Sequence, residues 1–377
     1  MAEKPFIFSR NMTAIAKGLA IVLMVYHHLF AFPDRISAVD YKPLMIVGNL
    51  PLDFLIGDFG KLCVAIFLFL SGLGLYKSFQ SKHQFNFRQA LRRVFNFMLL
   101  YWLIFFIFIP MGLQYFDDTI RYTWNTKQFF YNLFALIHTY NGEWWFISVY
   151  IELVLIFPFI VKLIEKSPVF VSYLAFICLF VSPFFLHLDD FFPKYELVQI
   201  AIDHLSLLLT WQIMFITGVY FAKYSLFEKM DQISSKIHLN NKIVFLLLLV
   251  GCYYFRQYTF KFIIETRGPA VDGIYNYSDF ILAPLVIFSF VKLVQNITIL
   301  EWLFEKLGKH STTIWLTHTF FIYYFFQEMS FAPYYSILIV IWVFMLTILV
   351  SIGINFLNRI VHFPFFRTMR TGHPNNN

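Results

Sequence analysis

Charged residues are scarce in this chain of 377 residues, and their scarcity argues against a water-soluble fold. Only 14% of the residues are Asp, Glu, Lys or Arg, against roughly 25% in a typical soluble domain. By contrast, 59% are hydrophobic and 21% are aromatic. Apolar runs of about 20 residues, the length of a helix that crosses a bilayer, recur along the chain. The sequence therefore predicts an integral membrane protein in which residues 1–377 form a single domain.

Cysteine is also scarce, and the familiar catalytic motifs are missing. Cys63, Cys178 and Cys252 lie in apolar segments without metal-site or disulfide spacing, so we expect small core residues. Adjacent helical residues point about 100° apart, so His27 and His28 would chelate poorly and we predict no metal site. The sequence lacks a Gly-Xaa-Ser-Xaa-Gly elbow, a Walker loop, an HExxH motif and a dinucleotide-binding glycine fingerprint. Any chemistry must use another set of residues.

Ten apolar runs, bounded by charged residues, Gly, Pro and Asn, predict an all-α transmembrane bundle of about ten helices. They lie near residues 12–32, 61–79, 94–113, 144–163, 168–187, 204–223, 242–260, 277–296, 311–330 and 333–356. Ten spans would put both termini on the same side of the membrane. That side would also carry 20 of the 29 Lys and Arg residues. Cationic residues collect in the cytoplasm, so we expect both termini there, as a short segment 1–11 and a polar tail 359–377.

This topology also explains the net charge of +7. No basic stripe lies on a soluble element, so nucleic acid is not an expected partner. The first apolar run carries Lys17 near its start and has no small-residue cleavage site, so it is predicted to remain as a helix rather than to be removed as a signal peptide.

Two ionisable residues of the first predicted helix share one face. Lys17 and His28 are eleven residues apart, which places them within about 20° of each other and separates them by roughly 16 Å of helix rise. In the predicted topology Lys17 lies near the inner leaflet and His28 near the outer one, so this face could line a path across the bilayer. Alternatively, Lys17 extends to the inner interface and His28 only forms a hydrogen bond within the bundle.

Two later helices contribute a carboxylate and a second histidine. A carboxylate as deep as Glu152 needs a partner or a proton, and a histidine is the expected partner. His318 lies about one third of the way into the predicted helix 311–330. Its alternative role is a structural hydrogen bond between helices.

A basic cluster precedes the third predicted helix. Arg88 and Arg92 are one helical turn apart, with Arg93 beside them, and such a cluster can bind phosphates through charge-assisted hydrogen bonds. It could equally anchor the chain near anionic lipid.

Four acidic residues lie in predicted outward loops that are rich in Tyr, Phe and Trp: Asp117, Asp118, Asp189 and Asp190. Such loops could contact a sugar. They could also form the aromatic belt that polytopic proteins place at the membrane interface.

Four motifs follow one another along the chain. A basic residue, ten residues and a histidine run from Lys17 to His28, and a Phe-rich segment at 65–75 contains Ser-Gly. Trp-Phe-Xaa-Ser ends at Ser148 and is followed by Pro158, and Leu-Gly-Lys-Xaa-Ser leads to His318. In this order, and with ten predicted helices, they resemble the acyltransferase 3 family of bacterial membrane acyltransferases.

The resemblance implies an O-acyltransferase of the bacterial plasma membrane. It would move an acyl group, which we expect to be acetyl, from cytoplasmic acetyl-CoA to a hydroxyl of a cell-surface or lipid-linked polysaccharide, without a permanently bound cofactor. His28 would be the general base or a transient acyl carrier, and Glu152 or His318 would orient His28 or the acceptor hydroxyl. The donor's phosphates would be held by four cations: Lys17, Arg88, Arg92 and Arg93.

The chain departs from the family pattern at two places. The family often has Arg where this chain has Lys17, which weakens the case for a bidentate contact there. It often has two Arg three residues apart where this chain has Arg88 followed by Arg92 and Arg93. Some relatives also carry an extracytoplasmic domain that completes the transfer. Here we expect the membrane domain to acylate its acceptor directly or with a separate protein.

Two other functions fit ionisable residues inside a membrane. One is a transporter or flippase for a glycan or acyl group, although the sequence shows neither an inverted repeat nor paired broken helices. The other is a structural subunit of a polysaccharide synthase, in which every intramembrane ionisable residue would tolerate mutation.

Overall fold

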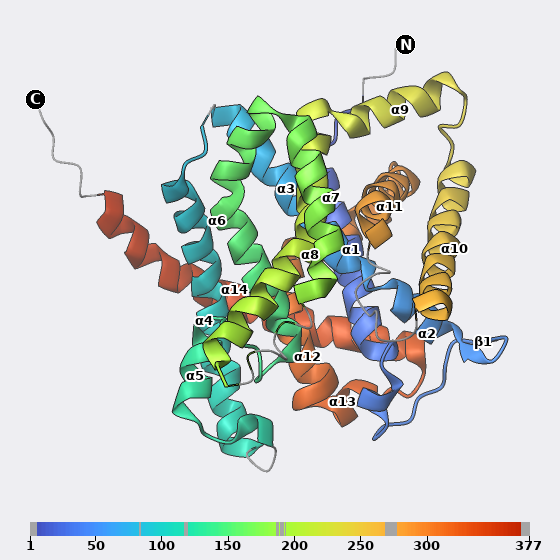
Figure 1. Ribbon diagram of the computed structural model, residues 1–377. Coiled ribbons are helices and arrows are strands. Elements are labelled where there is room, and N and C mark those ends of the chain that lie inside the picture. The colour runs from blue at the N-terminus through green and yellow to red at the C-terminus, as the bar shows by residue number, and fades with distance from the viewer. Residues whose placement is uncertain are drawn as a thin grey trace, which may run out of the picture.

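The computed structural model describes residues 6–82, 84–116, 120–185, 188, 192, 194–267 and 277–370, and nearly all of this part is helical (Figure 1). The predicted all-α class is confirmed. The long helices are α1 (Arg10–Phe30), α3 (Leu62–Lys82), α4 (Phe87–Tyr115), α6 (Trp145–Lys166), α7 (Pro168–Phe185), α8 (Glu196–Tyr224), α10 (Lys242–Arg267), α11 (Asp279–Val294), α12 (Thr298–Thr319) and α14 (Ser336–Arg370).

Short elements connect the long helices. They are α2 (Leu52–Phe59), α5 (Thr126–Leu133), α9 (Leu226–Lys236), α13 (Gln327–Phe331), the 3₁₀ turns η1 (Pro33–Ile36), η2 (Ile120–Tyr122) and η3 (Gly142–Trp144), and the π-helix η6 (Phe320–Tyr324). In the described part of the chain, the strands β1 (Ile46–Val47) and β2 (Leu50–Pro51) form one small antiparallel hairpin.

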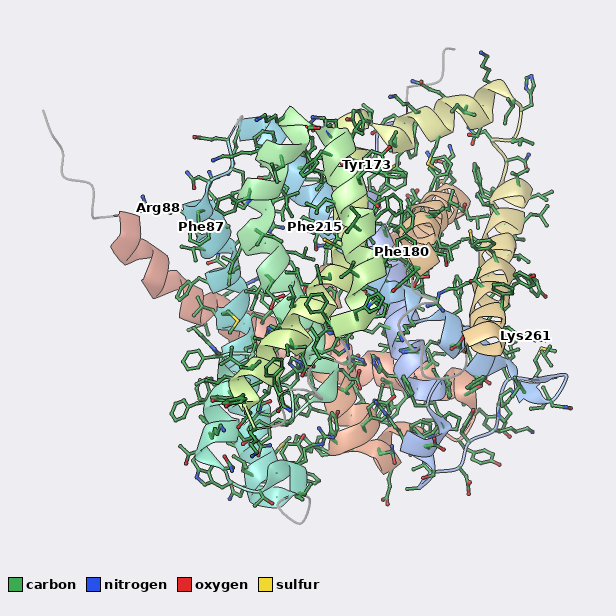
Figure 2. All side chains as sticks on the ribbon, viewed as in Figure 1. Phe87, Arg88, Tyr173, Phe180, Phe215 and Lys261 are labelled. Carbon is green, nitrogen blue, oxygen red and sulfur yellow. The ribbon has the colours of Figure 1, made fainter. Side chains whose placement is uncertain are left out.

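Seven helical stretches among the described residues are long and apolar enough to cross a membrane: Arg10–Phe30, Leu52–Lys82, Phe87–Tyr115, Gly142–Lys166, Pro168–Phe185, Glu196–Tyr224 and Ser336–Ile360. Their outer faces carry large exposed apolar side chains, such as Tyr173 and Phe180 on α7 (Figure 2). This surface suits a lipid environment. The count of ten spans and the side of the membrane on which the termini lie stay predictions.

One boundary prediction is wrong. The segment 311–330 is not a single helix, because α12 begins at Thr298, ends at Thr319 and is followed by η6 and α13. The middle of α12 carries exposed charges at Lys306 and Lys309, which interrupt the apolar run on which the prediction depends. At the end of the chain, α14 continues to Arg370, into the predicted tail 359–377, whose residues 371–377 lie outside the described residues.

The bundle has two distinguishable ends in Figure 1. Helix α9 lies at one end, and α5 and α13 lie at the other. The backbone N–H of Phe8 donates to Glu228 of α9 at 2.9 Å, whereas Gln327 of α13 donates to the carbonyl of Arg35, just beyond α1. Helix α1 therefore runs from the N-terminal end to the far end, and its last turn carries His28.

Glycines let α1 and α12 approach closely. A Cβ added at Gly308 would lie 1.8 Å from the carbonyl oxygen of Ala14, and one added at Gly18 would lie 2.0 Å from that of Phe304. No other residue fits at such contacts, and close approach through small residues is typical of helices packed in membranes. His28 lies ten residues after Gly18, and His318 lies ten residues after Gly308. The glycine contact therefore brings the two histidines to the same level of the bundle.

Candidate active site

His28 and His318 are in direct contact. Nε2 of His318 lies 2.9 Å from Nδ1 of His28. On its other side, Nδ1 of His318 lies 2.8 Å from the carbonyl oxygen of Trp315 and 3.1 Å from that of Ile314. Both rings are buried. The structure thus brings together two of the residues that the sequence singled out.

Glu143 completes the contact from a third element. Its Oε2 lies 3.1 Å from Nε2 of His28. The turn η3 that carries Glu143 is held by Asn141, whose side-chain oxygen accepts from the Glu143 backbone N–H at 3.1 Å and whose amide donates to Thr319 at 2.8 Å. Because Thr319 directly follows His318, one asparagine sets Glu143 against the end of α12.

Arg35 holds the other oxygen of Glu143. Its Nη1 donates to Oε1 of Glu143 at 2.5 Å, and its guanidinium lies over the rings of Phe32 and Tyr323. Partial burial opposes the charged form of Arg35, but the adjacent carboxylate outweighs this effect and raises the pKa of Arg35 above its ordinary value. The hydroxyl of Tyr323 donates to the carbonyl of His28. A chain of contacts therefore runs from Arg35 through Glu143 and His28 to His318.

The acceptors around the two rings fix where protons sit. Nδ1 of His318 faces two carbonyl oxygens, so it carries the proton and Nε2 of a neutral His318 is an acceptor. Nδ1 of His28 faces this Nε2 and, at 3.0 Å, the carbonyl of Met24, so it is the donor. Nε2 of His28 then meets a carboxylate oxygen of Glu143, and a hydrogen bond there needs one more proton. The pair His28 and Glu143 thus shares one removable proton.

Two cavities meet at this pair. One, of about 350 Å³, is lined by His28, Glu143, three tryptophans and polar groups of α8: Met24, His27, His28, Phe32, Lys61, Cys63, Val64, Glu143, Trp145, Phe146, Ser206, Leu207, Thr210, Trp211 and Trp315. The other, of about 310 Å³, is lined by Arg35, Arg121, Gly142, Glu143, Tyr323 and Tyr324. Glu143 lines both. Glu143 therefore lies where ligands held in the two cavities could meet.

Glu152 lies in a different cluster. Its Oε1 accepts from Nδ1 of His204 at 2.6 Å, and Nε2 of His204 lies 3.0 Å from the carbonyl of Leu136. A histidine partner for Glu152 was expected, and it is His204 of α8. The ring of His138 stacks nearby, and burial together with the neighbouring His204 lowers the pKa of His138 to about 4.

The four expected donor-binding cations lie toward the N-terminal end. Lys17 lies close enough to Arg93 for their charges to interact, and Nε of Arg93 reaches the hydroxyl of Tyr150 at 3.4 Å. Arg88 and Arg92 are exposed in the first turns of α4, and Figure 2 places Arg88 on the outer side of that helix. None of the four is among the residues that line the cavity at His28.

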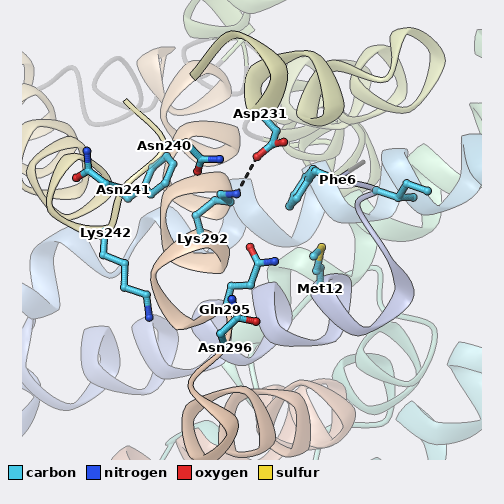
Figure 3. Close-up of a pocket in the computed structure, with 11 residues that line it drawn as sticks. Phe6, Met12, Asp231, Asn240, Asn241, Lys242, Lys292, Gln295 and Asn296 are labelled. Carbon is cyan, nitrogen blue, oxygen red and sulfur yellow. Dashed lines mark hydrogen bonds and ion pairs between the residues drawn. The ribbon is translucent and has the colours of Figure 1, made fainter. Parts of the chain in front are cut away.

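A larger cavity opens at the N-terminal end (Figure 3). It measures about 560 Å³, and its lining includes Met12, Lys242 and the ion pair of Lys292 with Asp231, in which the two charged groups are 2.7 Å apart. Met12 precedes His28 by sixteen residues of α1, or roughly 24 Å. This cavity is therefore separate from the one at His28.

Two further points concern a metal site and the acidic residues of the predicted outward loops. Among the described residues, no group of three or more His, Cys, Asp or Glu side chains could hold a metal ion. The acidic residues of the predicted outward loops, Asp117, Asp118, Asp189 and Asp190, lie outside the described residues.

Sequence reasoning missed Glu143, Arg35 and His204. Glu143 directly precedes the two tryptophans that open an apolar run, so it lies just outside the predicted helix 144–163. The available signal was the predicted depth of Glu143 in the membrane. Glu143 lies at the predicted outer end of one span, and His28 lies at the outer end of another.

A comparison with models of protein families gives one match. The family model Acyl_transf_3, described as an acyltransferase domain, matches residues 14–356. That range contains Lys17, His28, Glu143 and His318. Neither a curated protein nor a solved structure matches the chain.

Proposed function

Because this chain belongs to the acyltransferase 3 family, we propose that it is a membrane O-acetyltransferase. It moves an acetyl group from cytoplasmic acetyl-CoA to a hydroxyl of a cell-surface or lipid-linked polysaccharide, in the plasma membrane of a bacterium. The family supplies the reaction class, an acyl transfer in a multi-pass membrane protein. The acetyl donor, the glycan acceptor and the cellular location are the proposal.

One observation carries the proposal. The contact of His28 with Glu143 lies between two cavities, and Glu143 lines both. An acyl transfer needs a base that meets the acceptor hydroxyl on one side and the thioester on the other. The tryptophan-lined cavity would take the acetyl thioester, and the cavity with Arg35 and Tyr323 would take the acceptor.

His28 would act as the general base. Once the shared proton has left, Nε2 of His28 accepts the proton of the acceptor hydroxyl while the oxygen attacks the thioester carbonyl. The C–O bond forms, the C–S bond breaks, and the departing thiolate takes the proton from His28. Glu143 stabilises the imidazolium in between, Arg35 fixes the carboxylate, and His318 orients the ring through Nδ1.

The donor would reach this site from the N-terminal end. The cytoplasmic location of that end is the predicted one, and it carries Lys17, Arg88, Arg92 and Arg93, whose charges suit the phosphates of coenzyme A. Helix α1 connects these levels, since Lys17 precedes His28 by eleven residues. The extended donor would then place its thioester near His28.

The test is transfer by purified protein in liposomes supplied with acetyl-CoA and an oligosaccharide acceptor. The proposal expects release of free coenzyme A together with acetylated acceptor, detected by a thiol reagent and by mass spectrometry. A transporter or flippase would move a glycan and release no coenzyme A. A structural subunit would retain its role after any substitution at His28 or Glu143. Absence of both products would contradict the proposed acetyltransferase activity.

A further inference from the structure

The cavity beside Glu143 at the far end of the bundle carries more positive than negative charge. Among the described residues its ionisable lining consists of two arginines, one carboxylate and two tyrosines. The charge of Arg35 is matched by Glu143. The second guanidinium, that of Arg121, is the unmatched one.

Arg121 is held in place by neutral groups. Its Nη1 donates to the carbonyl oxygen of Thr139, and its guanidinium lies 4.8 Å from the centre of the Tyr324 ring. Within the described residues no carboxylate forms an ion pair with it. A guanidinium fixed in this way keeps further N–H donors for a planar anion, which it can bind through two parallel hydrogen bonds.

The remaining lining suits a sugar. Tyr323 and Tyr324 contribute ring faces and polar tips, and their hydroxyls are positioned by the carbonyl of His28 and by the N–H of Gly142. Apolar faces with a few fixed polar groups are typical of small-ligand sites. An acceptor held here would lie against Glu143, whose Oε2 is 3.1 Å from Nε2 of His28.

We propose that Arg121 binds an anionic group of the acceptor, a carboxylate or a phosphate, so that this site selects an acidic glycan over a neutral one. The proposal rests on the proposed function, because it identifies the cavity as the acceptor site. Arg121 would determine specificity by holding the charged substituent while a neighbouring hydroxyl reaches His28. Arg35 takes no part in this selection, since its charge is used by Glu143.

A binding experiment on the full chain in detergent tests the proposal without catalysis. The probes are a disaccharide ending in glucuronic acid, its methyl ester, and a matched disaccharide phosphate, each titrated by calorimetry. We expect the acid, the phosphate or both to bind at least about tenfold more tightly than the ester, with a preference that weakens as salt screens the charge. Equal binding of all three probes would overturn the proposal.

Variants then locate the effect. Arg121→Gln is expected to reduce the preference to less than twofold, and Arg121→Lys to retain part of it. The matched control is Lys127→Gln, which removes a nearby exposed cation paired with Glu196 and should leave the preference intact. A preference that survives in Arg121→Gln, or one lost equally in Lys127→Gln, would overturn the assignment to Arg121.

Acetyl transfer to the same probes separates this inference from the proposed function. Charge-selective binding without release of coenzyme A would contradict the proposed acetyltransferase activity. It would still support the anion site at Arg121. Transfer to the acid and its ester at equal rates would contradict the anion site alone.

Discussion

Nε2 of His318 lies 2.9 Å from Nδ1 of His28, and each histidine follows, by ten residues, a glycine at which α1 and α12 touch. The spacing explains how two helices far apart in sequence deliver their rings to one point.

Replacing Gly308 by Leu should separate the two histidines. The contact at Gly308 leaves no room for a Cβ, because the Ala14 carbonyl would lie 1.8 Å away, so α12 must shift from α1. We expect thermal unfolding in detergent to show a loss of about 1–3 kcal/mol, with acetyl transfer reduced at least tenfold. Gly353→Ala is the control, since a Cβ there meets nothing within 4 Å. Full activity in Gly308→Leu would contradict the spacing argument.

The two carboxylates near α6 should differ in importance. Glu143→Gln removes the charge that stabilises protonated His28, and we expect transfer to fall about 100-fold or more. Glu152→Gln disturbs only the pair with His204, and its rate should stay within about tenfold of wild type. Steady-state rates of both variants, measured after confirming equal insertion, give the comparison. The reverse order would restore Glu152 as the catalytic carboxylate.

His318 should behave as a positioning residue. His318→Leu removes one of the two acceptors for the Nδ1 proton of His28 and leaves the carbonyl of Met24. His28 then becomes a weaker and less firmly oriented base, so kcat should fall about tenfold with KM unchanged. The rising limb of the pH–rate curve should also move to lower pH. His318→Gln, whose amide oxygen can accept the same proton, should restore part of the rate. The control is His310→Ala, which removes another histidine of α12, one that is hydrogen-bonded to Ser351, and it should leave the pH–rate curve unchanged. If His318→Leu also leaves the curve unchanged, His318 has a purely structural role.

The basic cluster of α4 should act on donor binding alone. Replacing Arg88, Arg92 and Arg93 together by Gln is expected to raise KM for acetyl-CoA about tenfold or more with kcat nearly unchanged, because phosphate contacts far from the thioester contribute to binding. Lys242→Gln, in the separate cavity of Figure 3, is the matched control. An effect confined to Lys242→Gln would move the donor site to that cavity, and an effect in neither would leave the cluster as a lipid anchor.

Much of the fold could be predicted because apolar runs report directly on membrane helices. Each of the ten predicted segments overlaps a long helix. His318, however, lies in the last turn of α12 and not one third of the way into a helix. The break after Thr319 could not be predicted, since η6 consists of Phe, Ile and Tyr and continues the apolar run. Charges in the first half of α12 hid its true start.

The candidate site was harder to predict, because two of its members, Glu143 and Arg35, come from 3₁₀ turns whose placement depends on tertiary contacts. Glu143 reaches His28 only because Asn141 bonds Thr319, a contact between residues 178 positions apart in the chain. Nothing in the local sequence distinguishes Glu143 from an ordinary loop carboxylate. Glu152 had the more conspicuous position within an apolar run, yet its partner is His204.

The most direct test of the account is acetyl transfer by His28→Ala, compared with wild type in liposomes at equal protein content. If His28 is the general base, release of coenzyme A and acetylation of the acceptor should both fall at least about 100-fold, while acetyl-CoA still binds. Acetylation at the wild-type rate would contradict the central claim that His28, paired with Glu143 and oriented by His318, is the base.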